Sequence, residues 1–529
     1  MPDFRRDFAG ALLIACIGTA VAGAAPQQIE GHIEAEGKQA ARVPVAPDAA
    51  NATVYASDTW WQAGDGQEFP GRAVFANSSG ALAILRSGAP LATQGHPFFT
   101  ALGTNGRACV TCHQPADGMS VSTQTIQKRW EDTQGQDPLF AAVDGSNCPH
   151  LPQLQRTSHS LLLDRGLFRV FRPWPPKAAD GSTIDPEFTL EVVRDPTGCN
   201  LHPQYGVHST NPMVSVYRRP RPVANVKYLT AVGFPFEPKN GLPLPLDPET
   251  GEPTSGNLMA DARNRTLKSQ AVEASRVHLQ ASANPTEAQL GQILDFEATV
   301  YSAQGQDRWG GVLTEAGAQG GPETLAALTA GELQGGPRPI WSEFASWGKL
   351  ASASGAGNEE QRLFRESVAR GANVFANKTF LIRDAAGLTS IGFGNPVRNA
   401  CAFCHNMLRT GMDVAPGQVD LGTTNEPFAN AAPELPLFKL TCKPQYRSHP
   451  HLGRVVYTQD PGYALTTGKC RDIGKITIQQ MRGLAARAPY FSNGSAKTLR
   501  DLVDFYDRRY GIGYTEQEKQ DLVNLMSVL

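Results

Sequence analysis

The sequence has almost no excess of charge of either sign and few long apolar runs. Lys and Arg number 48 and Asp and Glu number 50 among 529 residues, a balance that points to neither a nucleic-acid partner nor an anionic membrane surface. The apolar run at residues 8–21 is too short to cross a bilayer, and no other stretch approaches that length. We therefore expect no transmembrane segment and no nucleic-acid partner.

The N-terminal apolar run predicts an export signal instead. Arg5 and Arg6 precede it, and the small residues at 22–24 follow it as a cleavage site. We assign residues 1–24 to a signal peptide, which places the mature chain in the periplasm. Lipoprotein processing at Cys16 is the alternative, although part of the apolar run would then remain beyond the modified cysteine.

Cysteine is scarce, and its positions are informative. Of the nine cysteines, one is removed with the signal and four belong to a repeated motif, which leaves Cys148, Cys199, Cys442 and Cys470. An even remainder in an exported protein indicates disulfides. Two of these cysteines lie between the motif copies and two lie after the second copy. We therefore pair Cys148 with Cys199 and Cys442 with Cys470; free buried thiols are the alternative.

The repeated motif is Cys-x-x-Cys-His, the attachment signature of c-type haem. Its copies consist of Cys109, Cys112 and His113, and of Cys401, Cys404 and His405. Each thiol of such a motif adds to one haem vinyl group, and the histidine supplies the proximal imidazole. Chance cysteine pairs and redox or zinc motifs are the alternatives. Two complete copies favour two covalently bound haem c groups, with His113 and His405 as iron ligands.

Apolar periodicity predicts a mainly α fold. With the two haem-attachment motifs, we expect two cytochrome c-like haem domains, with irregular and short β insertions in the first. The expected helices lie at 72–85, near Leu267, at 286–301, from Glu359, and from Leu499 and Thr515. Short strands are expected at 188–193 and 214–217. We divide the mature chain into a lead-in segment (25–75), a first haem domain (76–345) and a second haem domain (346–529).

Several segments around the two motifs resemble the bacterial di-haem cytochrome c peroxidase superfamily. The matching segments are 98–99 with 106–113, 270–271 with 295–297, and 488–495 with 499–506. The chain is most similar to the branch that contains the quinone-maturing di-haem enzyme and the di-haem rubber oxygenases. The resemblance covers roughly residues 75–529, and residues 114–265 match it loosely. It implies a reaction haem in the N-terminal half and an electron-transfer haem in the C-terminal half.

The resemblance also implies a sixth ligand for the second haem. The position that holds Met or Tyr in the family is Tyr506 here, on the apolar face of the helix predicted from Leu499. A core tyrosine is the alternative for this residue. Met481, Met412 and His449 are the competing ligands.

At the first haem, the family places a distal Gln and, ten residues later, an acid–base Glu. Gln270 matches the first position, but Gln280 at the second cannot exchange protons. His278 can take that role, because imidazole titrates near neutrality, provided that the helix breaks between residues 278 and 280. The alternatives are a structural His278 or a His278 that closes the sixth iron position.

The chain departs from the family pattern at several positions. The family's inter-haem tryptophan falls near Phe234, and Ser492 replaces a histidine. Calcium, which some members bind between the haems, is not supported here because Gln479 or a neighbour replaces the usual proline. Arg218, Arg219 and Arg221 are candidates for pairing with haem propionates, and a solvated basic loop is the alternative.

Together these features predict a periplasmic di-haem oxidoreductase that reacts with hydrogen peroxide at the His113 haem. The His405 haem would relay electrons. One alternative is an oxygenase that uses dioxygen on an organic substrate. Another is an electron carrier without a substrate, although the chain is far longer than two ordinary carrier domains need. The electron donor, or an organic or protein substrate, cannot be named from the sequence.

Overall fold

The computed structural model describes residues 52–178, 180–230, 258–327, 340–352, 358–388, 394–405, 418–430 and 432–529. The signal peptide assigned to residues 1–24, and with it Cys16, lies outside these segments. Within them, no helix is long and apolar enough to cross a membrane.

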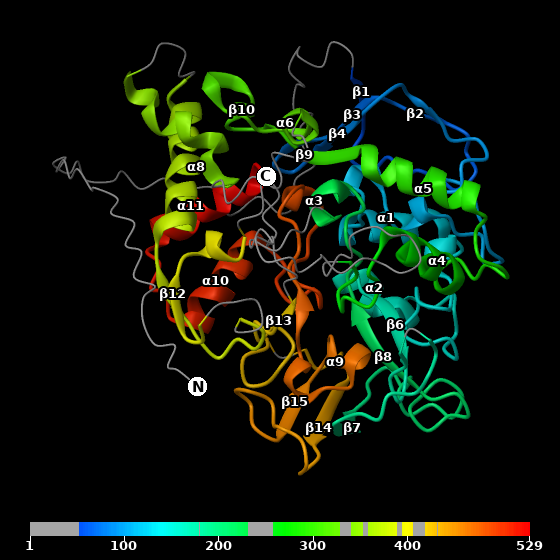
Figure 1. The fold of residues 1–529 in the computed structure, drawn as a ribbon. Coiled ribbons are helices and arrows are strands. Elements are labelled where there is room, and N and C mark those ends of the chain that lie inside the picture. The colour runs from blue at the N-terminus through cyan, green and yellow to red at the C-terminus, as the bar shows by residue number, and fades with distance from the viewer. Residues whose placement is uncertain are drawn as a thin grey trace, which may run out of the picture. The chain divides into compact units, whose positions relative to one another are not determined.

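The largest sheet has five strands in the order β1-β3-β4-β9-β10 (Figure 1). Its strands are β1 (Thr53–Tyr55), β3 (Arg72–Asn77), β4 (Gly80–Arg86), β9 (Val300–Asp307) and β10 (Gly311–Val312). The helix predicted at 72–85 is therefore wrong, because this segment is the β3–β4 hairpin. Strand β4 pairs with β3 on one side and β9 on the other, and residues 80–84 are all buried. A strand without alternating exposure lacks the two-residue period that marks strands in a sequence.

The mainly α fold class is also wrong, because the structure is 32% helical and 19% strand. Four two-stranded sheets pair β2 (Glu68–Phe69) with β5 (Leu91–Ala92), β6 (Phe168–Pro173) with β8 (Met213–Arg218), β11 (Phe380–Ile382) with β12 (Val397–Asn399), and β13 (Gln418–Val419) with β16 (Ile476–Thr477). Strand β8 confirms the strand predicted at 214–217. Pairings such as Leu82 with Gln304 join distant parts of the chain, and local periodicity does not reveal them.

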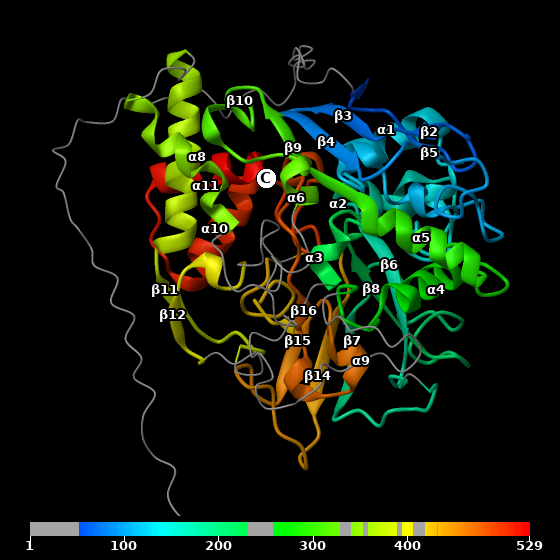
Figure 2. The same cartoon turned by 45° about the horizontal axis from the view of Figure 1, so that its top comes forward.

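The helices before residue 330 are α1 (Thr123–Thr133), α2 (Ser160–Arg165), α3 (Val226–Thr230), α4 (Leu267–Val277), α5 (Glu287–Thr299) and α6 (Pro322–Ala327). Helices α4 and α5 lie side by side in both Figure 1 and Figure 2. The hydroxyls of Thr266 and Thr286 cap their N-termini. The helix prediction near Leu267 is confirmed. Helix α5 confirms the prediction at 286–301, except that residues 300 and 301 begin β9.

The helices after residue 339 include the 3₁₀ helix η7 (Ile340–Ser352), α8 (Glu359–Asn377), α9 (Ala464–Thr467), α10 (Leu499–Tyr510) and α11 (Glu516–Ser527). Helices α8 and α11 cross closely at Gly371, where a Cβ atom would lie 2.1 Å from the carbonyl oxygen of Asp521. The three predicted helices in this region are confirmed. Thr515 caps α11 by accepting the backbone N–H of Glu518, in a capping box.

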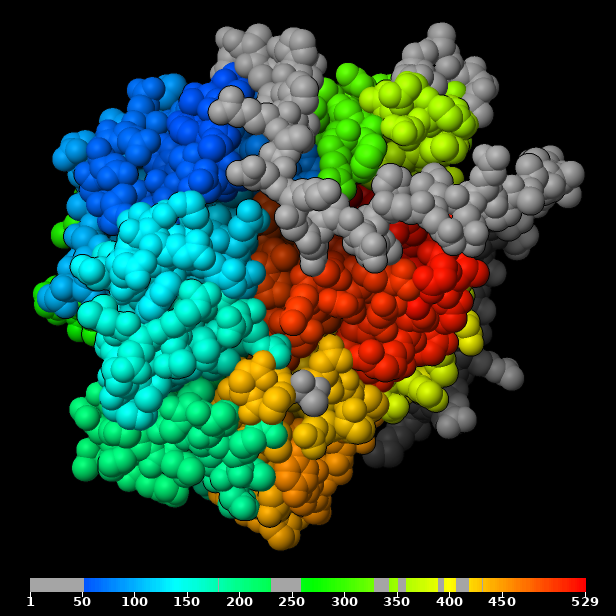
Figure 3. All heavy atoms as spheres, turned by 180° about the vertical axis from the view of Figure 1, so that it is seen from behind, coloured from blue at the N-terminus to red at the C-terminus, as the bar shows by residue number. Residues whose placement is uncertain are grey.

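A three-stranded sheet, β15-β14-β7, joins the two halves of the chain. Its strands are β7 (Phe188–Arg194), β14 (Leu437–Cys442) and β15 (Val455–Thr458), and β7 confirms the strand predicted at 188–193. On the face seen in Figure 3, the cyan segment that contains α2 adjoins the orange and red C-terminal residues. Arg165 there forms an ion pair with Glu434. The proposed division at residues 345/346 is therefore crossed by strand pairing.

Both expected disulfides are confirmed. The Cα atoms of Cys148 and Cys199 are 5.4 Å apart, and those of Cys442 and Cys470 are 6.0 Å apart. The second disulfide joins β14 to the 3₁₀ turn at Cys470–Asp472. The four remaining cysteines outside the signal segment are the motif cysteines, which belong to neither disulfide.

Candidate functional site

Each Cys-x-x-Cys-His motif forms part of the wall of a separate cavity. We call the cavity beside His113 the first cavity and the cavity beside His405 the second cavity. Including their openings, they contain about 1450 and 1540 Å³ of atom-free space, respectively. Because these volumes include open solvent, they describe open hollows, each with one complete haem-attachment motif in its wall.

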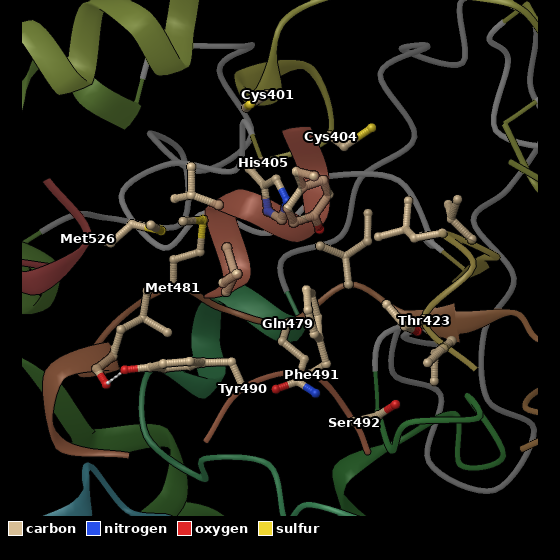
Figure 4. Close-up of a pocket in the computed structure, with 18 of the residues that line it drawn as sticks. Cys401, Cys404, His405, Thr423, Gln479, Met481, Tyr490, Phe491, Ser492 and Met526 are labelled. Carbon is tan, nitrogen blue, oxygen red and sulfur yellow. Dashed lines mark hydrogen bonds between the residues drawn. The ribbon is translucent and has the colours of Figure 1, made fainter. Parts of the chain in front are cut away.

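Both cysteines of each motif lie at the wall of one cavity. The 3₁₀ turns η2 (Cys109–Thr111) and η9 (Cys401–Phe403) bring both thiols of each motif to the wall of one cavity. In Figure 4, Cys401 and Cys404 lie at the same end of the second cavity as His405. These residues fit one covalently attached haem in each cavity.

His113 is held in the form that an iron ligand needs. Its Nδ1–H donates to the carbonyl oxygen of Met119 over 3.0 Å, which leaves Nε2 free to bind a metal. Burial lowers the pKa of His113 to about 4. The imidazole is therefore neutral at physiological pH, and a neutral ring is the form that coordinates metals.

Helix α4 brings both predicted distal residues to the first cavity. Gln270 and His278 line it, with Ala274 between them on the same helix face. The helix ends at Val277, and His278 is its C-cap. Gln280 has a left-handed backbone conformation (φ 55°) and is exposed. The helix break on which the role of His278 depends is therefore present, and Gln280 lies outside the cavity wall.

A buried carboxylate orients His278. Oδ2 of Asp144 lies 2.5 Å from Nδ1 of His278, and Oδ1 of Asp144 contacts the guanidinium of Arg107. Burial opposes ionisation of Asp144, but the charges of Arg107 and His278 lower its pKa below the usual value. An ionised Asp144 accepts the Nδ1–H of His278, so Nε2 carries the lone pair.

Sequence reasoning missed both partners of His278. Arg107 lies two residues before the first cysteine of the first haem motif, and its guanidinium also donates to the carbonyl oxygens of Pro138 and Leu139 over 2.6 Å. Asp144 is far from His278 in sequence and belongs to no recognisable motif. Only the fold brings the two residues together.

Glu297 is a second titratable group in the first cavity that sequence reasoning did not assign. It lies on α5, lines the cavity and is 4% exposed. Burial raises its pKa to about 8. The carboxyl group is therefore mostly protonated at pH 7, and it can donate a hydrogen bond into the cavity.

The second cavity has a different wall. Tyr506 of α10 lines it, and burial raises the pKa of its phenol. Met481 also lines it, together with Met526 of α11, which sequence reasoning missed. Figure 4 shows the two methionine side chains on the same side of His405. The described wall of this cavity contains no second histidine.

The other two competing ligands are not part of that described wall. His449 is buried elsewhere, 3.7 Å from Oδ2 of Asp420, and Met412 lies outside the described residues. No cluster of three or more His, Cys, Asp or Glu side chains able to hold a metal ion occurs in the described segments. The family's inter-haem tryptophan position falls near Phe234, and Phe234 also lies outside the described residues.

Comparison with known proteins gives a partial match. No family model matches the chain. It is 34% identical over 82 residues to the cytochrome-c peroxidase IdrP1 of Denitromonas iodatirespirans, which covers 13% of this chain and 22% of that protein. The protein of the same name from Pseudomonas sp. (strain SCT) is 35% identical over 81 residues, or 13% and 21%.

The link to cytochrome-c peroxidases is a loose one. The chain spans about a fifth of the length of these two relatives. The finer branch within the superfamily therefore remains a proposal.

Of the three candidate arginines, Arg218 is already paired, because Asp460 and Asp261 accept its N–H groups over 2.6–2.8 Å. Arg219 and Arg221 line the first cavity. Arg219 also lines the second cavity, as do Gln479 and Gln480. Arg219, Gln479 and Gln480 therefore belong to the wall that the two cavities share.

Proposed function

We propose that this protein is an exported, periplasmic di-haem peroxidase that reduces hydrogen peroxide at the first cavity and supplies electrons through the second. The observation that carries the proposal is the asymmetry of the two cavities. Both have a haem-attachment motif, but the first adds an amide and a carboxylate-bound imidazole, whereas the second adds phenol and thioether groups. The partial match to cytochrome-c peroxidases supports the same reaction class.

The first cavity has the groups that peroxide cleavage needs from a protein. Haem bound there supplies the redox chemistry. Nε2 of His278 takes a proton from bound peroxide and returns one to the departing oxygen. Asp144 holds the ring in the required tautomer, and the amide of Gln270 orients the peroxide by hydrogen bonding. Acid–base catalysis of this kind contributes about 10²–10⁴-fold to a rate.

The second cavity fits a relay. Cys401, Cys404, His405 and Tyr506 line the same cavity and would together hold a haem there, with Tyr506 as a second iron ligand beside His405. Tyrosine is a known haem ligand. A haem held in this way would supply electron storage and transfer.

The test is peroxide-driven oxidation of the reduced, haem-loaded protein in a stopped-flow spectrometer. His278→Ala should slow the reaction by at least about tenfold, just below the weak end of the acid–base range, and both haems should remain attached. His208→Ala is the matched control, because this histidine is exposed and lines neither cavity. A faster reaction would identify His278 as an iron ligand that closes the site, and an unchanged rate would remove its assigned role.

A further inference from the structure

The wall between the two cavities contains two buried arginines, Arg219 and Arg487. Arg219 lines both cavities, and Arg487 lines only the second. The guanidinium of Arg219 donates to the carbonyl oxygens of Val121 and Arg487 over 2.6 and 3.0 Å. The guanidinium of Arg487 donates to those of Arg482 and Gln480 over 3.0 and 2.6 Å. Backbone carbonyls therefore hold both groups in place.

Neither guanidinium forms an ion pair within the described part of the chain. No carboxylate oxygen there lies within 4.0 Å of either guanidinium, in contrast to Arg218 with its two aspartates. The buried carboxylate of Asp117 acts on Arg219 from a greater distance. Each arginine is 7% exposed. Burial lowers the pKa of both to about 10, and the charge of Arg487 adds to this effect at Arg219. Buried charges without a counter-charge are strongly destabilising, so an anion in the cavities would offset a large cost.

A third buried polar group at this wall, the hydroxyl of Ser492, has no hydrogen-bond partner among the described residues. The hydroxyl of Ser492 is buried, lines the second cavity and makes no hydrogen bond. The backbone joins it to the same wall, because Arg219 N–H donates to the carbonyl oxygen of Ser492 over 2.8 Å. In Figure 4, Ser492 and Gln479 lie at the opposite end of the view from Cys401, Cys404 and His405. Buried polar groups are almost always hydrogen-bonded, so this hydroxyl is available to donate to a ligand in the second cavity.

We propose that Arg219, Arg487 and Ser492 form a carboxylate-binding wall for the propionates of the second haem, and that Arg219 acts on both haems. The chemistry is complementary, because the thioether bonds fix one edge of a haem and its two carboxylates project from the opposite edge. Arginine is also the usual partner of carboxylates in proteins. The proposal rests on the di-haem part of the proposed function and is independent of peroxide.

The arrangement has a consequence for the reduction potentials. A positive charge beside a haem disfavours the oxidised form, which carries one more positive charge than the reduced form. Removal of the Arg219 charge should therefore lower both potentials, whereas removal of the Arg487 charge should lower only one. The charge of Arg219 would thus raise the reduction potentials of both haems.

The experiment is a spectroelectrochemical titration of the haem-loaded protein and its variants. Arg219→Gln should lower both midpoint potentials, and Arg487→Gln should lower one by at least 59 mV, a tenfold change in the one-electron equilibrium. Arg219→Lys should stay near the wild type because it keeps the charge. Arg454→Gln, which removes an exposed guanidinium, is the control for a general charge effect.

Each outcome decides the proposal. If Arg219→Gln shifts one potential only, the shared role is wrong; if Arg487→Gln shifts none, the carboxylate wall is wrong. If Arg219→Gln fails to retain haem, the Arg487→Gln and Arg219→Lys variants still test the proposal. Two lowered potentials in Arg219→Lys, which keeps the positive charge, would contradict the role of that charge. Shifted potentials without peroxide activity would refute the proposed peroxidase function and leave this wall intact.

Discussion

Substitution of Asp144 by Asn tests how the first cavity controls its histidine. The change keeps the size of the side chain but removes the charge that faces both His278 and Arg107. A hydrogen bond to a charged group contributes about 1.5–3 kcal/mol. If the reaction loses that amount at its transition state, the rate falls about tenfold to hundredfold, at about 1.4 kcal/mol per factor of ten. Asp144→Asn should therefore slow peroxide-driven haem oxidation by that factor.

The same substitution should also destabilise the fold. Asp144 and Arg107 are each 1% exposed as side chains, and removal of one partner of a buried ion pair costs about 3–5 kcal/mol. Denaturant unfolding measures this loss. Asp137→Asn is the matched control, since Asp137 is buried but pairs with the partly exposed Arg129 over 2.6 Å and lies outside the first cavity. It should leave the peroxide rate unchanged.

A double variant separates the role of Asp144 from general damage. Because Asp144 acts through His278, Asp144→Asn should slow the wild type but add nothing to His278→Ala, in the manner of two coupled residues. Stopped-flow rates of the wild type, the two single variants and the double variant provide the comparison. A wild-type rate in Asp144→Asn, or losses that multiply in the double variant, would refute the reasoning.

Three further predictions follow from the cavities. Intact mass should exceed that of the processed chain by two haems that survive acid–acetone extraction, and extraction of either haem would contradict covalent attachment. Tyr506→Phe should make the second haem high-spin or recruit a new ligand such as Met481 or Met526, while the first haem keeps its spectrum; an unaltered spectrum would make Tyr506 a packing residue. Because the pKa of Glu297 is raised to about 8, the folded state binds a proton that the unfolded state releases above about pH 4.5. Glu297 should therefore contribute a fall in stability of about 1.4 kcal/mol per pH unit between about 4.5 and 8, beside Asp117, Asp307 and Asp420, whose pKa values burial raises to about 6. In denaturant titrations, Glu297→Gln should remove the Glu297 contribution, which dominates between about pH 6 and 8.

The sequence was most informative where chemistry fixes spacing. The two disulfides and the helices α4, α8, α10 and α11 could be predicted, because each depends on residues that are close in the chain or on counting. The β3–β4 hairpin could not, because a strand buried on both faces shows no alternation. The fold class failed for the same reason, since the sheets depend on partners far away in sequence.

The site shows the same division. Gln270 and His278 share one helix, so their common cavity could be predicted from a local pattern. Asp144 could not be predicted, because its contact with His278 joins a loop to the end of α4. Arg219 was one of three equivalent candidates in the sequence. Only the ion pairs of Arg218 and the position of Arg219 between the cavities distinguish them.

The most direct test of the central claim is the stoichiometry of a single turnover. Conversion of one hydrogen peroxide to two waters consumes two electrons, which is the number that two reduced haems hold. The fully reduced, anaerobic protein should therefore be oxidised at both haems by one equivalent of peroxide, with no spectral change after the second electron has been removed. Two haems that remain reduced after addition of peroxide, but are oxidised when dioxygen is admitted, would contradict the account.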